Sequence, residues 1–168
     1  MSAPPAGPRF ALVRVDDRLL HGQVVYGWGG ALDPRHYYIV DDAAAGDAWT
    51  ADALRASVEG AAVTVLAVAR FAAQWSRLPE TERSIVLLRD PETLLRLHDA
   101  GFPPSDPVNL GGIRQGPAAR AFLPYLQLLP PGVALLCRLL REGVPLFAQD
   151  LPGAVRYDAA ALAAMLDC

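Results

Sequence analysis

Short apolar runs alternate with longer stretches of mixed polarity along almost the whole chain. Runs rich in Val, Leu, Ile and Tyr are typical of strands, and the amphipathic stretches between them are typical of helices. We expect strands at Phe10–Val15, Tyr37–Val40, Ala62–Ala67, Ser84–Leu88, Val108–Leu110, Pro124–Leu128 and Pro145–Gln149. We expect helices near Gln23–Ala31, Asp47–Glu59, Ala69–Arg77, Pro91–Ala100, Pro131–Glu142 and Asp158–Leu166.

This alternation predicts an α/β fold. The expected architecture is a single doubly wound, mostly parallel sheet with helices on both faces, and it leaves room for an antiparallel edge strand. Asp90 before Pro91 has the pattern of a helix start, and Gly101 and Gly143 have that of helix ends. Residues 1–8, with their prolines, predict a flexible tail, and residues 9–168 predict one domain.

Composition narrows the class of protein. Of the 168 residues, 52% are hydrophobic and 20% charged, which is typical of a soluble globular domain. A net charge of −3 argues against nucleic acid as the main partner. No apolar run approaches the roughly 20 residues that a membrane-spanning helix needs. The use of cysteine favours a cytoplasmic location.

The two cysteines predict no disulfide framework. Cys137 falls in an apolar helical stretch and Cys168 is the last residue, 31 positions away. We expect Cys137 to be a small core residue and Cys168 to have no role, in a reducing compartment.

The most informative segment is Arg14-Val-Asp-Asp-Arg-Leu-Leu-His-Gly-Gln-Val24, where an apolar strand breaks into a charged loop before a helix. A loop between strand and helix presents backbone N–H groups to an anion. Here His21 could carry a phosphoryl group itself, because a neutral imidazole is a good nucleophile towards phosphorus. We call Asp16–Gly22 the histidine loop.

The neighbours of His21 supply what phosphoryl transfer needs, which is mainly positioning and donors around the phosphoryl oxygens. The Arg18 guanidinium could bind those oxygens, with Arg14 as a second candidate. Asp16 or Asp17 could hold the other ring nitrogen of the imidazole. The backbone N–H groups expected to cradle the phosphate are those of Gly22, Gln23 and Val24.

Other readings of these residues stay open. Asp16, Asp17 and Arg18 could form surface ion pairs with no chemical role, as most charged loops do. Asn109 could donate to a phosphoryl oxygen or only stabilise the turn into Gly111. Asp41-Asp42 could orient Arg14 or Arg18, or cap the next segment.

The Arg14–Val24 segment closely resembles the start of the enzyme IIB component of the mannose/fructose/sorbose class of sugar phosphotransferase systems (PTS). In that family the segment Arg-x-Asp-Asp-Arg-Leu-(Ile/Leu)-His-Gly-Gln-Val carries the phosphorylated histidine, which corresponds to His21. Weaker matches follow at Trp28, at Tyr38-Ile39-Val40 with Asp41-Asp42, and at Val108-Asn-Leu-Gly-Gly112. The resemblance covers nearly the whole chain after the proline-rich tail.

The resemblance implies a phosphoryl carrier that is modified on Nδ1 of His21. It implies a phosphorylated IIA protein as donor, and the membrane IIC and IID permease as partners that bring in a sugar. No metal or other cofactor is expected, and a homo-oligomer is left open. The carrier would lie at the inner face of the membrane only through its partners.

One loop departs from the family pattern. After Gly111-Gly112 the chain continues Ile113-Arg114-Gln115-Gly116, where Arg114 could still point at the phosphate and Arg120 is expected at the surface. An alternative function is a regulatory histidine phosphoacceptor that transports no sugar. A third is an anion-binding module without a covalent step, although the chain has no GxxxxGK[ST] phosphate loop.

Overall fold

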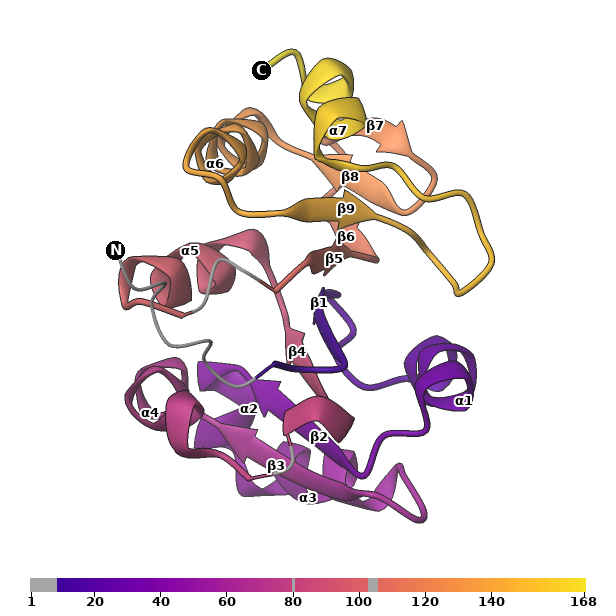
Figure 1. Ribbon diagram of the computed structural model, residues 1–168, viewed down its shortest axis with the longest axis vertical. Helices are drawn as coiled ribbons and strands as arrows, with labels where there is room; N and C mark the ends of the chain where they lie inside the picture. Colours follow the sequence, from indigo (N-terminus) through magenta and orange to yellow (C-terminus); the bar gives the residue numbers. More distant parts are fainter. Residues whose placement is uncertain (1–8, 80, 103–105) are drawn as a thin grey trace, which may run out of the picture.

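A computed structural model describes residues 9–79, 81–102 and 106–168. The tail expected over residues 1–8 lies outside the described residues. Six strands form one parallel sheet in the order β3-β2-β4-β1-β5-β9 (Figure 1). Their bounds are β1 Leu12–Val15, β2 His36–Val40, β3 Ala62–Leu66, β4 Ser84–Leu88, β5 Val108–Leu110 and β9 Leu146–Ala148. The prediction of a doubly wound parallel sheet is therefore confirmed.

Helices cover both faces of this sheet (Figure 1). One face is covered by a π-helical segment at Gln23–Trp28, α1 Gly29–Leu32, α2 Asp42–Gly46 and α3 Ala48–Ala56. The other is covered by α4 Val68–Gln74, α5 Pro91–Asp99, α6 Pro130–Arg141 and α7 Ala159–Leu166. Two short 3₁₀ turns, Trp75–Arg77 and Thr81–Arg83, complete the connections before β4.

Alternate residues of each strand point to opposite faces, and both faces are apolar. In β4, for example, Ile85 and Leu87 pack under the first group of helices, and Val86 and Leu88 pack under the second. All four are completely buried. Burial on both faces explains why these strands are continuous apolar runs in the sequence.

A second, three-stranded sheet was not predicted. It consists of β6 Ile113–Arg114, β7 Arg120–Leu123 and β8 Leu126–Leu128, in the order β6-β8-β7. The strand predicted at Pro124–Leu128 was expected in the main sheet. Its last three residues do form a strand, β8, but this strand belongs to the small sheet. The main sheet has no antiparallel edge strand among the described residues, because β3 and β9 pair in parallel with their neighbours, and antiparallel pairing of strands occurs between β7 and β8 in the small sheet. At the edge strand β9 it is limited to the single bridge between Ala148 and Tyr157.

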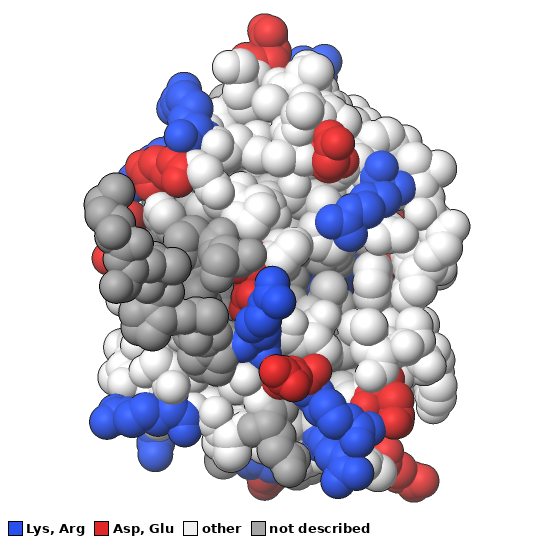
Figure 2. All heavy atoms as spheres, in the orientation of Figure 1, with Lys and Arg blue, Asp and Glu red and all other residues white. Residues whose placement is uncertain are grey.

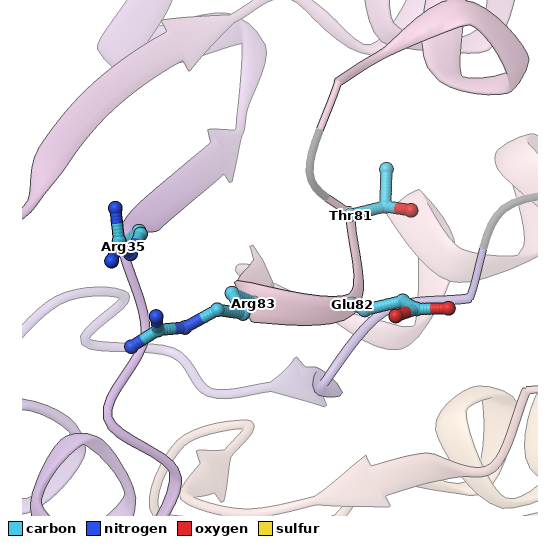
Figure 3. Close-up of a pocket in the computed structure, with 4 residues that line it drawn as sticks. All are labelled: Arg35, Thr81, Glu82 and Arg83. Carbon is cyan, nitrogen blue, oxygen red and sulfur yellow. The ribbon is translucent and has the colours of Figure 1, made fainter.

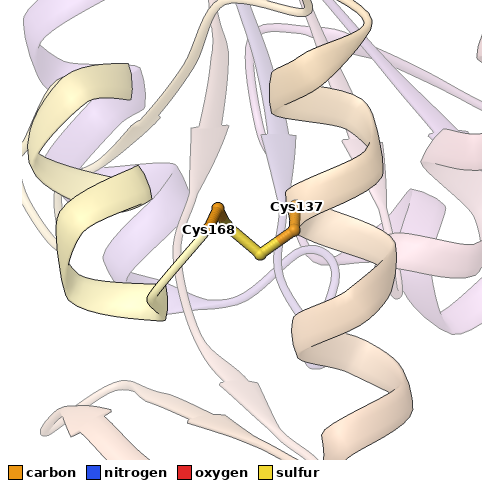
Figure 4. The surroundings of a disulfide bond; sticks show 2 residues. All are labelled: Cys137 and Cys168. Carbon is orange, nitrogen blue, oxygen red and sulfur yellow. A yellow bond between two sulfur atoms is a disulfide. The ribbon is translucent and has the colours of Figure 1, made fainter.

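The expectation of unpaired cysteines is also wrong, so the cysteines give no support to the expected reducing compartment. Cys137 on α6 and Cys168 form a disulfide (Figure 4). Helix α7 packs against both α6 and β9, which returns the last residue to the side of α6. A separation of 31 residues carries no information about this proximity, because it depends on how the two helices pack.

The ends of several helices have local causes. Asp90 accepts a hydrogen bond from the Thr93 N–H and precedes Pro91, which confirms the predicted start of α5. The helix expected at Asp47–Glu59 corresponds to α3, which is shorter. A further helix, α2, precedes it and was not predicted. Within the three described ranges, no helix is long and apolar enough to cross a membrane.

Candidate functional site

Four polar residues and one glycine directly follow five neighbouring strands of the main sheet. Along the sheet they are Asp41 after β2, Arg89 after β4, Asp16 after β1, Gly111 after β5 and Gln149 after β9. All the strands are parallel, so these residues share the carboxyl edge. The chain leaves β1 towards one face and leaves β4 towards the other, and such a divergence is where ligands bind in doubly wound sheets.

The imidazole of His21 lies at this edge, held from one side by a carboxylate. His21 Nε2 is 2.9 Å from Asp16 Oδ2, and the histidine side chain is 15% exposed. An ionised carboxylate can only accept a hydrogen bond, so Nε2 must carry the hydrogen. In the neutral ring Nδ1 then has the free lone pair. The arrangement leaves Nδ1 without a hydrogen in the neutral ring.

Asp16 is completely buried, yet its carboxylate is held in the charged form. Oδ2 accepts from His21 and from the Arg14 guanidinium, and Oδ1 accepts from the Arg18 backbone N–H at 3.1 Å. Burial alone raises the pKa of the Asp16 carboxyl, but the His21 hydrogen bond and the Arg14 charge outweigh it, so this pKa lies below its usual value.

Arg14 supports the site from beneath. Its guanidinium is completely buried, donates to Asp16 at 2.9 Å and to the Gln149 carbonyl at 3.1 Å, and also bonds Asn109. It lies 5.8 Å from the centre of the Trp28 ring. Asn109 is buried too, and donates to the same Gln149 carbonyl. The structure thus places Arg14 and Asn109 behind Asp16, away from the exposed side of the imidazole.

Gly111 is required by the closeness of this arginine. A Cβ atom at Gly111 would lie 2.6 Å from Arg14 Nε and closer still to Cζ and Nη2. An ordinary side chain would therefore displace the guanidinium. The Gly111 N–H donates to the Val15 carbonyl at 2.9 Å, which fixes the backbone against β1.

Two exposed arginines lie at the mouth of the site. Arg18 Nη2 donates to Gln23 Oε1 at 2.7 Å, with Arg18 Nε 3.9 Å from Asp16 Oδ1. Arg114 donates its backbone N–H to Asp17 Oδ2 at 3.0 Å, and its Nη1 lies 3.5 Å from Asp17 Oδ1. Asp17 therefore holds Arg114 and does not hold the imidazole.

The chain after His21 does not start as an ordinary helix. The N–H groups of both Val24 and Val25 donate to the His21 carbonyl, and a π-helical segment begins at Gln23. The Val24 N–H is thus occupied, which contradicts its expected role in a phosphate cradle. Within the described part of the chain, the backbone N–H groups of Gly22 and Gln23 make no hydrogen bond.

Sequence reasoning missed Arg89 and left two interpretations open for the aspartates after β2. Asp41 pairs with Arg89, and Asp42 pairs with Arg96 at 2.8 Å, so neither orients Arg14 or Arg18. Asp41 also accepts from the Ala44 N–H and caps α2, as one of the two readings expected. Arg89 is the first polar residue after a buried strand, which is the same signal that singled out Asp16.

A separate hollow lies at the opposite edge of the main sheet. This hollow, of about 560 Å³, is lined by Arg35, Thr81, Glu82 and Arg83, which precede β2 and β4. In Figure 3 the charged ends of Glu82 and Arg83 point away from each other. Figure 2 shows acidic and basic side chains interspersed over one face, with wide uncharged areas.

Comparison with known proteins gives the family. The family model described as "PTS system sorbose subfamily IIB component" matches residues 10–166. The N-acetylgalactosamine-specific phosphotransferase enzyme IIB component 1 of Escherichia coli K12 is 24% identical over 148 residues, which are 87% of this chain and 93% of that protein.

Solved structures share the fold. ManxB from Thermoanaerobacter tengcongensis superposes with a TM-score of 0.81 at 24% identity, covering 95% of this chain and 98% of that one. The IIBSor domain of the sorbose permease from Klebsiella pneumoniae gives a TM-score of 0.77 at 24% identity, covering 88% and 91%. With a family model that matches almost the whole chain, this protein belongs to the sorbose subfamily of PTS IIB components.

Proposed function

We propose that this protein is a phosphoryl carrier in sugar uptake, with Nδ1 of His21 as the phosphorylated atom. The family supports phosphoryl transfer within a sugar phosphotransferase system. The hydrogen bond between His21 Nε2 and Asp16 Oδ2 carries the assignment to Nδ1, because it leaves that nitrogen unprotonated in a neutral ring.

In the first step, the Nδ1 lone pair attacks the phosphorus of a phosphohistidine on a IIA protein. A bond forms between His21 and phosphorus, the bond to the donor imidazole breaks, and the donor ring keeps that electron pair. In the second step, a sugar hydroxyl oxygen attacks the same phosphorus. The bond to Nδ1 breaks, Nδ1 regains its lone pair and the hydroxyl proton is released.

The surrounding residues have separate parts in this proposal. Asp16 orients the imidazole, and Arg14 with Asn109 positions Asp16 from below. The phosphoryl oxygens are bound by Arg18 and Arg114, which are exposed at the mouth, and by the N–H groups of Gly22 and Gln23. These side chains provide charge and position, which phosphoryl transfer mainly requires.

The proposal extends to the partners and the location. The donor is a phosphorylated IIA protein or domain, and the acceptor is a sugar delivered by membrane IIC and IID components. Residues 9–168 act as one carrier domain in the cytoplasm, peripheral to the membrane through those components.

The test is phosphorylation in vitro. The protein is incubated with phosphoenolpyruvate, the general phosphotransferase proteins and a cognate IIA, and its intact mass is measured. We expect one acid-labile phosphoryl group on the wild type and none on His21→Ala. Labelling that persists in His21→Ala would place the acceptor elsewhere and refute the assignment.

A second variant tests the phosphate-binding role of Arg18. Arg18→Ala should slow labelling about 10-fold, because one charge-assisted contact to the phosphoryl group is lost. Arg120→Ala is the matched control, because Arg120 is also an exposed arginine. Its guanidinium carbon lies over the Phe122 ring, 4.7 Å from the ring centre. Equal rates for the two variants would remove Arg18 from the mechanism.

A further inference from the structure

A second group of contacts holds the histidine loop from the β4 side. Arg89 follows β4 directly and forms two hydrogen bonds with Asp41, Nε to Oδ1 at 2.9 Å and Nη2 to Oδ2 at 2.8 Å. Asp41 is only 5% exposed and is also fixed by the Ala44 N–H at 2.9 Å. The guanidinium is therefore held in one orientation, as planar two-point pairs are.

The third donor of this arginine reaches the histidine loop. Arg89 Nη1 donates to the backbone carbonyl of Asp17 at 3.3 Å. On the other side of the loop, the Asp17 N–H donates to the Gly112 carbonyl at 2.7 Å, and the Asp17 side chain accepts from Arg114. The backbone of Asp17 is thus held between the ends of β4 and β5, the two neighbours of β1.

The loop needs such support because its backbone is strained. Leu19 has a φ of 56°, a left-handed conformation that is unfavourable for a residue with a branched side chain, and its side chain is buried. Asp17 and Leu19 both lie between Asp16 and His21. A shift of the Asp17 peptide would therefore change the distance between the imidazole and the carboxylate that orients it.

We propose that Arg89, anchored by Asp41, is a positioning residue that fixes the histidine loop so that His21 keeps its hydrogen bond to Asp16. The inference rests on the proposed function of His21. Arg89 acts through the Asp17 carbonyl and touches no reacting atom.

The experiment measures single-turnover phosphorylation of wild type and variants with phosphorylated IIA in excess and at varied concentration, so that kcat here is the maximal rate constant of labelling and KM is the half-saturating concentration of the donor. Arg89→Ala should lower kcat about 10-fold or more, because small misplacements of a reacting group are costly, and should leave KM within twofold. Asp41→Asn should act in the same direction, since it removes the anchor but keeps an oxygen for the Ala44 N–H. Arg89→Lys, whose ammonium group makes a point contact in place of the two-point pair, should have a kcat between those of the wild type and Arg89→Ala.

Arg96→Ala is the matched control. Arg96 pairs with the neighbouring Asp42 at the same 2.8 Å, and its side chain is 53% exposed, but it makes no contact with the histidine loop. This variant should keep the wild-type kcat and KM. Thermal unfolding of each variant shows whether it is folded at the assay temperature.

Amide hydrogen exchange gives a readout that does not depend on phosphorylation. The segment 16–22 should exchange faster in Arg89→Ala and Asp41→Asn than in the wild type or Arg96→Ala, and His21→Ala should match the wild type over residues 16–19. If the wild type is never labelled, the proposed function is refuted. The exchange data then test only the contact between Arg89 and the histidine loop. A wild-type kcat in Arg89→Ala, a rise in KM only, or unchanged exchange overturns this inference.

Discussion

A single methyl group at Gly111 should damage the site without changing any charge or polar group. In Gly111→Ala the new Cβ would lie 2.6 Å from Arg14 Nε, whereas ordinary contacts begin at 3.4 Å. The guanidinium must therefore retreat by about 1 Å. Its 2.9 Å hydrogen bond to Asp16 would then be longer than a hydrogen bond allows.

The size of the effect follows from these contacts. Overpacking a buried site costs about 1–3 kcal/mol, and weakening a hydrogen bond between charged groups adds about 1–2 kcal/mol. We expect Gly111→Ala to lose about 2–5 kcal/mol of unfolding free energy. For a chain of this length that lowers the unfolding midpoint by about 4–20 °C. His21 labelling should slow about 10-fold, because Asp16 no longer holds the ring in place.

The assays are thermal unfolding followed by circular dichroism, and the rate of His21 labelling. Gly30→Ala is the matched control: Gly30 is in α1, and nothing lies within 4 Å of an added Cβ. It should be as stable as the wild type or about 1 kcal/mol more stable, because alanine favours a helix. A Gly111→Ala protein that melts and reacts like the wild type would refute the close approach of Arg14.

Two further predictions concern stability. Cys168→Ser should lower the unfolding free energy by about 3.7 kcal/mol, since the disulfide closes a loop over a separation of 31 residues. An unfolding midpoint that is the same with and without reductant would contradict this. The pKa of Asp41 is lowered, because Arg89 and the Ala44 N–H outweigh the effect of burial, which raises it. A lowered pKa means that the folded state binds its proton less readily than the unfolded state, so this stabilisation is present above about pH 4 and is lost as the pH falls further. Urea unfolding at pH 5 and pH 3 should therefore show a smaller loss for Asp41→Asn than for the wild type, and equal losses would count against the ion pair.

The sequence was sufficient for the main sheet because its strands are buried on both faces. Ser84–Leu88 shows this most clearly, since all five residues are buried and the predicted bounds match β4. The small sheet was missed because β6 has only two residues, too few for a period to appear, and because the predicted strand that contains β8 was expected in the main sheet. The π-helical segment was missed for a similar reason, as its pattern of apolar residues differs little from that of an α-helix.

The candidate site was predictable only where its residues are close in sequence. Asp16, Arg18 and His21 fall within six positions, and the structure brings them together. Arg89 lies 48 positions from its partner Asp41 and depends on strand order, which local patterns do not supply. The role of Arg14 was not apparent, although a single arginine inside an apolar strand is a sign of a buried, paired charge.

The limited exposure of the imidazole has a kinetic consequence. With 15% of its side chain open to solvent, His21 offers a partner only a small surface. On the proposed function, donor protein and sugar-bearing permease compete for the same opening, so no complex of all three forms. Double-reciprocal plots at several donor concentrations should then give parallel lines, the pattern of a ping-pong exchange.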